Sequence, residues 1–457
     1  MVSSTVNSLW RESTQHPAIE RQPLLQDLSC DIAIIGGGYS GLWSAYYLKK
    51  LLPDSRIVII EANQVGFGAS GRNGGWCSGF LPNSIGELDK LHGRDTALEM
   101  YRQSFATLDE IENVLQSSQI DCDYFRGGTL NGATNDMQRS RVLHEVEELH
   151  GYGFGDEDFR MISTAEQLSR INITGLKAAS FTPHCAVIHP LKLVLGLAQC
   201  VEKLGVKIYE NTPVNEYTSG ALKAGEFTCR ADLIVRATEG FTSQIKRHRR
   251  TLAPLYSYMI ATAPLNANQL ADLGWSNRET YHDTRNLIIY AQITKDKRIA
   301  FGGRGAPYHY ASRVKAEYDT HSLIHGKIIQ SMNEVFPVTK ELEITHRWGG
   351  PLGVPRNWQP SVNFDKRTGL ASLGGYIGDG VAATNLAGRT LAHLIADDNH
   401  PLTRLAWVNK PSRKWEVEPL RYFGINYLLK LSDSIDQHEA KTNQPDRIRQ
   451  RILDSFL

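Results

Sequence analysis

Residues 31–75 read DIAIIGGGYSGLWSAYYLKKLLPDSRIVIIEANQVGFGASGRNGG, and this stretch decides the fold. An apolar run at 32–35 predicts a buried strand, and a G-x-G-x-x-G motif beginning at Gly36 follows it at once. A helical pattern comes next, and a second apolar run occupies residues 57–60. The segment therefore predicts a strand, a tight glycine turn, a helix and a second, parallel strand.

The three glycines of the motif have separate tasks in a dinucleotide site. Gly36 permits the tight turn, Gly38 lets the backbone approach a pyrophosphate at the helix N-terminus, and Gly41 lets the helix pack close to the sheet. Glu61 lies 20 residues beyond Gly41, where a carboxylate can accept hydrogen bonds from a ribose. These features together predict dinucleotide binding, but the motif alone does not separate NAD from FAD.

The glycine-rich loop at 68–75, which reads GASGRNGG, favours FAD. It resembles the flavin-contacting loop of the D-amino-acid oxidase-like superfamily of FAD-dependent oxidoreductases, and within it the gamma-glutamylputrescine oxidase branch. The resemblance extends over nearly the whole chain. In the N-terminal part of the chain it assigns to the cofactor Gly36, Gly38, Tyr39, Ser40, Gly41, Glu61, Ala62, Ala69, Ser70, Arg72, Asn73, Gly74 and Gly75.

Two later stretches match the same superfamily. The strand end at Val214 and the turn at Ala237-Thr238 correspond to backbone that closes over the dinucleotide, although many strands end in such a turn. A further glycine-rich loop opens a helix and is a nest of N–H donors at a positive dipole end. Family members often carry His where this chain has Asp379, which could equally cap the helix. The resemblance adds to the cofactor site Gly375, Gly378, Asp379, Gly380 and Val381.

The expected fold is α/β, with a Rossmann-like FAD-binding domain and an interleaved, antiparallel β-rich substrate domain. Aromatic and apolar alternation over residues 251–310 predicts the antiparallel strands of the second domain, and residues 313–333 are predicted to form one helix. We expect the FAD-binding domain to comprise residues 1–85, 184–245 and 340–410, the substrate domain residues 86–183 and 246–339, and a helical C-terminal tail residues 411–457.

The composition suits a globular enzyme and argues against several partners. The chain has 457 residues, 41% of them apolar, and a net charge of +1, which gives no general attraction to nucleic acid or acidic membranes. No run of 18 apolar residues predicts a membrane span and no apolar N-terminal segment predicts a signal peptide, so we expect a cytoplasmic protein. The six cysteines form no C-x-x-C pair, so we expect no metal site.

The cysteines also bear on how FAD is held. Similar enzymes such as monomeric sarcosine oxidase attach flavin through a cysteine in the C-terminal half, whereas the last cysteine of this chain is Cys229. We therefore expect non-covalent FAD. If the flavin proves to be covalently attached, Cys77 is the residue to suspect.

Side chains on the predicted strands of the substrate domain and beside the glycine loop are candidates for the substrate pocket. Amine-oxidising sites use aromatic walls to exclude water and to hold an amine by the ring face. Ordinary core packing is the competing interpretation for each aromatic residue, and no catalytic residue can be assigned from spacing. The candidates are Trp76, Tyr256, Tyr258, Tyr290, Arg304, Tyr308, His309 and Trp348.

The sequence predicts oxidation of the C–N bond of a primary or secondary amine, with oxygen or another electron acceptor as the second substrate. Amino-acid oxidases of the superfamily commonly clamp the substrate carboxylate with an arginine, whereas residues 287–292 offer Tyr290 and Gln292. Arg304 could instead bind an anion farther from the reacting carbon. The alternatives are an oxidase or dehydrogenase of N-methyl or D-amino acids, an aminophosphonate oxidoreductase, an NAD-dependent dehydrogenase, and a non-catalytic flavin-binding protein.

Overall fold

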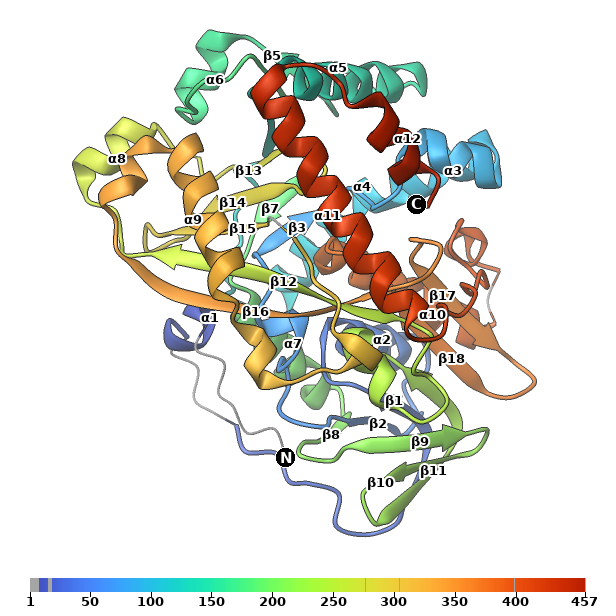
Figure 1. Cartoon of the computed structure of the whole chain (residues 1–457). Coiled ribbons are helices and arrows are strands. Elements are labelled where there is room, and N and C mark those ends of the chain that lie inside the picture. The colour runs from blue at the N-terminus through green and yellow to red at the C-terminus, as the bar shows by residue number, and fades with distance from the viewer. Residues whose placement is uncertain (1–7, 15–18, 276, 304, 398, 457) are drawn as a thin grey trace.

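The structure is a computed structural model that describes residues 8–14, 19–275, 277–303, 305–397 and 399–456. Figure 1 shows two sheet regions, one beside the other, with helices around both. One sheet has a parallel, Rossmann-like centre and the other is mostly antiparallel, so the predicted fold class is confirmed.

The first sheet, sheet A, contains the strand that precedes the glycine motif. Its strands span Leu28–Ile35 (β1), Ile57–Ile60 (β2), Lys207–Tyr209 (β8), Val214–Thr218 (β9), Ala221–Ala224 (β10), Phe227–Arg236 (β11), Ser361–Asp365 (β17) and Leu370–Gly374 (β18). Their order is β17-β18-β11-β1-β2-β8, and the antiparallel strands β9 and β10 extend from β11. The neighbours from β18 to β8 run parallel, as the sequence predicts.

The apolar run of β1 is buried on both faces of sheet A. Ile32 and Ile34 pack into the large core that contains the helices, whereas Ala33 and Ile35 pack with residues of β9 and β10 on the other face. A strand covered on both faces needs apolar residues at consecutive positions, which explains why this run does not alternate with polar residues.

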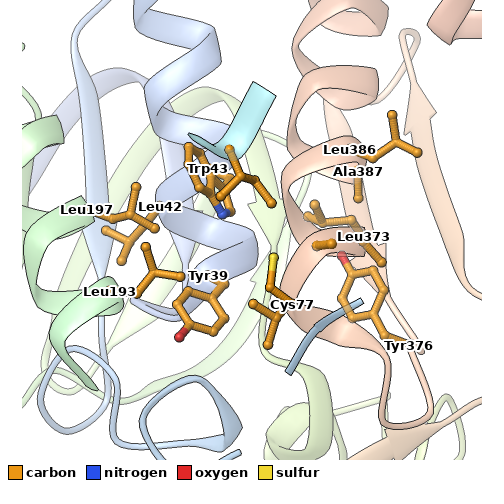
Figure 2. Close-up of a cluster of buried hydrophobic side chains, with 14 of the residues drawn as sticks. Tyr39, Leu42, Trp43, Cys77, Leu193, Leu197, Leu373, Tyr376, Leu386 and Ala387 are labelled. Atoms are coloured by element: carbon orange, nitrogen blue, oxygen red, sulfur yellow. The ribbon is translucent and has the colours of Figure 1, made fainter. Parts of the chain in front are cut away.

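Three helices cover the first of these faces, namely α2 (Tyr39–Leu51), α7 (Pro190–Lys203) and α10 (Gly380–Ala396). α10 crosses α2 closely, since a Cβ on Gly388 would lie 2.9 Å from the backbone nitrogen of Ser44. Figure 2 shows the two helices side by side, with Cys77 between Tyr39 at the start of α2 and Tyr376 in the loop that precedes α10. The N-termini of two helices therefore converge on one region.

The second sheet, sheet C, consists of eight strands. They span Thr129–Ala133 (β4), Arg160–Ile162 (β5), Ala178–Thr182 (β6), Ala253–Thr262 (β12), Thr280–Asp283 (β13), Ile289–Ile293 (β14), Ile299–Gly303 (β15) and Ile344–Val354 (β16). The order is β16-β12-β15-β14-β13-β4-β6-β5, with β4 and β13 parallel and the other neighbours antiparallel. Two short strands form a separate antiparallel pair, β3 (Trp76–Ser78) and β7 (Cys185–Val187). β3 directly follows the glycine loop at 68–75.

The remaining helices surround these sheets (Figure 1). They span Leu9–Glu12 (α1), Ile85–His92 (α3), Arg94–Ser117 (α4), Asp136–Gly151 (α5), Thr164–Arg170 (α6), Ala267–Leu273 (α8), Ser322–Val335 (α9), Leu420–Thr442 (α11) and Arg447–Asp454 (α12). α9 packs against one face of sheet C in a separate apolar core, and α5 lies against β4 and β6.

The helix predicted over residues 313–333 is shorter than expected. α9 begins only at Ser322, where the His321 side chain accepts a hydrogen bond from the Ile324 N–H. The preceding residues have tertiary partners instead, because the Lys315 N–H donates to the Tyr256 hydroxyl and Asp319 pairs with an arginine of the glycine loop. These long-range contacts override the local helical pattern.

Candidate active site

The glycine turn after β1 packs so closely against neighbouring backbone that two of its positions have no room for a side chain. Gly36 has a φ of +111°, and a Cβ there would lie 2.5 Å from the carbonyl oxygen of Ala237. A Cβ on Gly41 would lie 2.0 Å from the carbonyl oxygen of Gly36, whereas at Gly38 the nearest atom would be the Ser70 hydroxyl oxygen, 2.8 Å away. The turn therefore brings bare backbone to the first turn of α2, whose N–H groups lack partners within the helix and suit a pyrophosphate.

Glu61 fixes this turn from the end of β2. Its carboxylate accepts hydrogen bonds from the Gly37 N–H at 2.7 Å and from the Asn63 N–H at 2.9 Å. Burial raises the pKa of Glu61, and these N–H donors oppose that shift. The side chain is still partly exposed, so the acid predicted to meet the ribose also positions the turn that would meet the pyrophosphate.

The second glycine-rich loop begins with a 3₁₀ turn, Ala69–Gly71, and is tied to the first loop. The Ser70 hydroxyl accepts a hydrogen bond from the first N–H of α2 at 2.9 Å. The Asn73 amide donates to the carbonyl oxygens of Ala69 and Ser70 and accepts from the Gly75 N–H at 2.8 Å. The Asn73 side chain thus holds the shape of the loop.

Arg72 links this loop to the second half of the molecule. Its guanidinium donates to Asp319 at 2.8 Å, to the Phe67 carbonyl oxygen at 2.6 Å and to the Gly349 carbonyl oxygen at 3.3 Å. Burial lowers the pKa of Arg72, and the Asp319 carboxylate raises it. The contact of Arg72 with flavin or phosphate stays a prediction, and the structure shows that two of its guanidinium nitrogens have protein partners.

The third glycine-rich loop, 374–380, joins the first at the N-termini of α2 and α10. The Gly375 N–H donates to the Glu239 carboxylate at 2.9 Å, and the Ser40 and Tyr376 hydroxyl oxygens lie 3.2 Å apart. The three loops therefore lie together, although the third is about 300 residues from the other two in the chain.

Asp379 lies at the start of α10 without capping it through its side chain. Burial raises the pKa of Asp379 to about 7, yet the side chain is partly exposed. Its negative charge raises the pKa of Tyr290 and Tyr101. Its influence on Tyr290 shows that Asp379 lies on the side of sheet A that meets sheet C.

The other predicted cofactor residues lie along the same edge of sheet A. The Ala237 N–H donates to the Ile35 carbonyl oxygen at 2.9 Å, and the Thr238 hydroxyl oxygen lies 2.8 Å from that of Thr242. Val214 is buried at the start of β9, and Ala62 is exposed just beyond Glu61. The predicted cofactor residues thus surround the carboxyl ends of β1, β2 and β11, where dinucleotides bind in such folds.

A row of laterally paired residues crosses sheet C on the face that meets the glycine loop. Directly paired residues on neighbouring strands point to the same face of a sheet, so the side chains of the row share one surface. In strand order the row consists of Trp348, Met259, Gly302, Tyr290, His282, Asn131, Ser180 and Met161.

The glycine loop contacts the middle of this row. A Cβ on Gly74 would lie 2.8 Å from the Tyr290 ring, and the Gln292 amide donates to the Gly74 carbonyl oxygen at 2.5 Å. The Trp76 ring lies 6.0 Å from that of Tyr290 and 5.7 Å from that of His282, both in edge-to-face geometry. All three rings are partly exposed. The structure therefore forms a three-ring set, Trp76, His282 and Tyr290, beside the loop predicted to contact flavin.

His282 is neutral in this environment. Burial lowers its pKa to about 4, and a hydrogen bond with the Asp283 backbone opposes that shift. The imidazole therefore carries no charge at neutral pH.

Trp348 lies in the same row, and its indole N–H donates to the Arg72 carbonyl oxygen at 2.8 Å. Three of the predicted pocket residues, Trp76, Tyr290 and Trp348, are thus brought to one face of sheet C. Arg304 lies outside the described residues.

The structure places the remaining candidates elsewhere. Tyr256 and Tyr258 alternate with Ser257 and Met259 on β12 and point to the opposite face, where both are fully buried. The Tyr308 hydroxyl donates to Glu418 near the C-terminal helix, and the His309 ring stacks on Tyr318 at 3.6 Å. These four residues do not join the three-ring set.

Orphaned polar atoms support a bound group at this position. The indole N–H of Trp76 and the amide oxygen of Gln292 are buried, and neither has a hydrogen-bond partner among the described residues. Both side chains belong to the surface formed by the glycine loop and sheet C. A flavin ring offers donors and acceptors to such atoms, and three glycine loops leave room for its backbone contacts, so the residues present fit FAD.

The fold and these loops define an FAD-dependent oxidoreductase architecture, and comparison with known proteins names the family. Residues 31–394 match the family described as DAO, FAD dependent oxidoreductase, and the chain belongs to that family. It is 30% identical to the gamma-glutamylputrescine oxidoreductase of Escherichia coli over 82% of this chain and 85% of the relative. It is 28% identical to the probable oxidoreductase OrdL of Haemophilus influenzae over 85% and 88%.

The fold is also similar to that of the glycine oxidase from Geobacillus kaustophilus. The crystal structure of that enzyme superposes with a TM-score of 0.67 and 20% identity, covering 82% of this chain and 96% of the other. The protein is therefore an FAD-dependent oxidoreductase of the amine and amino-acid oxidase family.

Sequence reasoning missed several residues that the structure brings to the site. They are Asn131, Ser257, Met259, His282 and the glycine Gly302. Gln292, which the sequence offered in place of an arginine, also reaches the glycine loop. Strand register decides which residues meet across a sheet, and a single sequence does not contain that register. Alternation along a strand shows which residues share a face, but the pairing of His282 with Tyr290 follows only from the register of β13 with β14.

Among the described residues, no helix is long and apolar enough to cross a membrane. In the same part of the chain, no group of three or more His, Cys, Asp or Glu side chains is arranged to hold a metal ion.

Proposed function

We propose that this protein oxidises the C–N bond of a primary or secondary amine, with hydrolysis of the resulting imine to a carbonyl compound. The observation that carries this proposal is the three-ring set of Trp76, His282 and Tyr290 beside Gly74. Aromatic faces attract an alkylammonium group and exclude water from the reacting carbon. Bound FAD would supply the two-electron acceptor that takes the hydride from the carbon next to nitrogen.

The side chains on this face favour an amine over an α-amino acid. An α-carboxylate is best held by a bidentate guanidinium. The loop-facing positions of β13 and β14 are His282, Tyr290 and Gln292, which offer neutral groups at neutral pH. Arg72, the arginine of the glycine loop, is paired with Asp319. The relative in Escherichia coli is named for a substituted amine, gamma-glutamylputrescine, which agrees with this preference.

Asp379 is the group best suited to take a proton from the bound ammonium. An amine must lose its proton before hydride can leave the neighbouring carbon, because the nitrogen lone pair stabilises the positive charge that forms. A general base acts best when its pKa lies near the working pH, and burial raises the pKa of Asp379 to about 7. Its charge also acts on Tyr290, which belongs to the proposed amine site.

We further propose that FAD is held without a covalent bond by the residues of the three loops. Cys77 is fully buried in β3, and burial raises the pKa of its thiol well above the usual range, so it is a poor nucleophile. Sheet A and sheet C draw their strands from alternating parts of the chain. We propose FAD-binding residues 1–85, 184–245 and 340–410 and substrate-domain residues 86–183 and 246–339. The strands of sheet A lie in the first set, and those of sheet C lie in the second, except β16, which falls within 340–410.

Anaerobic reduction of the bound flavin tests the proposal. The purified protein would be mixed without oxygen with alkylamines, D- and L-amino acids, N-methyl amino acids and aminophosphonates, and loss of flavin absorbance would be followed. We expect primary or secondary alkylamines to bleach the flavin fastest. Faster bleaching by a free α-amino acid would replace the proposal with an amino-acid oxidase, and faster bleaching by an aminophosphonate would replace it with that activity. Readmission of oxygen then shows whether oxygen is the electron acceptor.

A further inference from the structure

The row across sheet C continues beyond the three-ring set into a polar end. His282 pairs with Asn131 on β4, and Asn131 pairs with Ser180 on β6. The Asn131 amide donates to the Glu145 carboxylate of α5 at 2.8 Å. Glu145 is partly exposed, although burial raises its pKa to about 7. Glu145 is therefore desolvated but keeps some accessible surface.

The polar end carries acceptor atoms that lack donors. The Asn131 side chain is 1% exposed and Ser180 is fully buried, yet the Asn131 amide oxygen and the Ser180 hydroxyl have no hydrogen-bond partner among the described residues. A buried carbonyl oxygen without a donor is costly, so a bound group that donates hydrogen bonds would be stabilised here.

The electrostatic environment of this end is negative. The side chains that act on the pKa of Glu145 are Asn131 and Glu148, and neither carries a positive charge. The pKa of Tyr101 is raised by four carboxylates, two of them on α5, one on α3 and one at the start of α10. Those carboxylates are Glu145, Glu148, Glu87 and Asp379. An ammonium group suits this end, because it can donate hydrogen bonds to the unpartnered acceptors and carries a charge opposite to that of the carboxylates.

We infer that Glu145 and Asn131 bind a second, distal ammonium group, so that the substrate is a diamine or polyamine whose reacting amine lies at the three-ring set. This inference rests on the proposed amine oxidation. Tyr290 and Asn131 are two strands apart, which is about 9–10 Å between backbones. An extended chain of about six carbons spans that separation with a nitrogen at each end.

The inference differs from a distal anion site. An anion at this end would be repelled by the carboxylate of Glu145 and by that of Glu148, which acts on Glu145. A diamine whose second nitrogen is acylated presents an amide instead of an ammonium group. It would keep one donor for the Asn131 carbonyl oxygen but would lose the attraction to Glu145.

Paired substrates of equal length test the inference. Hexamethylenediamine and hexylamine share the reacting end, and N-acetylhexamethylenediamine replaces the distal ammonium by an amide. We expect the wild-type protein, loaded with FAD, to show a KM for the diamine about tenfold or more below that for each monoammonium compound. Glu145→Gln should raise the KM for the diamine by about tenfold while leaving the KM for hexylamine unchanged.

Glu147→Gln is the matched control, because Glu147 is exposed on the same helix two residues away. It should change neither KM, and flavin content and thermal stability should show that both variants are folded. Equal KM values for the diamine and hexylamine in the wild-type protein would overturn the inference and leave the proposed function intact. Equal effects of Glu145→Gln on both substrates would also overturn it. If neither amine bleaches the flavin while amino acids do, the proposed function itself fails.

Discussion

Tyr290 owes its position to two glycines. A Cβ on Gly302 would lie 2.4 Å from the ring, and a Cβ on Gly74 would lie 2.8 Å from it, so the ring fits between two bare backbones. Its hydroxyl oxygen lies 3.2 Å from the Ser257 hydroxyl oxygen. The sequence identified Tyr290 as a pocket candidate and Gly74 as a cofactor residue, but it could not identify their contact or the role of Gly302, because both depend on how separate segments pair.

Two substitutions at Tyr290 separate the ring from its hydroxyl. Tyr290→Phe keeps the aromatic face and should leave the KM for alkylamines within about twofold of the wild type. Tyr290→Leu removes the ring and should raise that KM by about tenfold, which corresponds to roughly 1–2 kcal/mol for a lost cation–π contact. Steady-state kinetics with matched flavin content provides the measurement. An equal loss in both variants would show that the hydroxyl, and not the ring, matters.

The protonation of Glu145 gives a pH dependence with a definite sign. Burial raises the pKa of Glu145 to about 7, so this carboxyl is neutral below that pH and negative above it. The advantage of hexamethylenediamine over hexylamine should therefore grow as the pH rises from 6 to 8. The ratio of the two KM values is the quantity to measure, because titration of the shared reacting end largely cancels in the ratio. A ratio that is constant with pH, or that falls, would contradict the assignment.

At the scale of elements, the arrangement depends on how closely the turn, α2 and α10 approach one another. The Cβ positions show that the glycines of the motif are not equivalent. At Gly41 the obstacle is backbone, 2.0 Å away, whereas at Gly38 it is the hydroxyl of Ser70, which can rotate. The structure thus distinguishes two positions that the sequence motif treats alike.

Gly41→Ala should abolish retention of FAD, because the turn must open to admit the methyl group. Gly38→Ala should retain the fold and bind FAD more weakly. Gly424→Ala is the matched control, since Gly424 is exposed in α11 and its Cβ would meet nothing within 4 Å. The flavin-to-protein absorbance ratio after gel filtration measures retention. Full retention by Gly41→Ala would refute the role given to the close contact.

Local sequence signals predicted the elements well where short-range chemistry decides them. The sequence predicted β1, the turn, α2 and β2 correctly because the glycine spacing, the apolar pattern and the lengths of the apolar runs all indicate the same strand–turn–helix–strand unit. The helix expected from residue 313 failed to begin there because Tyr256 on β12 and Arg72 in the glycine loop supply distant partners. Likewise, His282 entered the site only through the register of β13 with β14.

At the scale of the whole molecule, one site is assembled from loops at residues 36, 68 and 374 and from strands of sheet C. The sequence could predict the three loops because each carries its own glycine pattern. It could not predict the face of sheet C, because eight strands contribute single residues to one row. The polar end at Asn131 and Glu145 was missed for the same reason.

Non-covalent attachment makes a prediction for the intact protein. Acid precipitation should leave FAD in a yellow supernatant above a white pellet, because Cys77, which follows the glycine loop, is buried and has a raised thiol pKa. Absorbance of the two fractions measures the outcome. Flavin that remains in the pellet would show a covalent bond, and loss of that bond in Cys77→Ser would identify its site.

The most direct test of the central claim is anaerobic bleaching of the flavin in the purified, FAD-loaded protein. The central claim is that the three-ring set beside Gly74 receives an amine for oxidation at the carbon next to nitrogen. Alkylamines should reduce the flavin faster than any α-amino acid at equal concentration, and Tyr290→Leu should slow that reduction at low amine concentration. Faster reduction by α-amino acids, with alkylamines inert, would contradict the account.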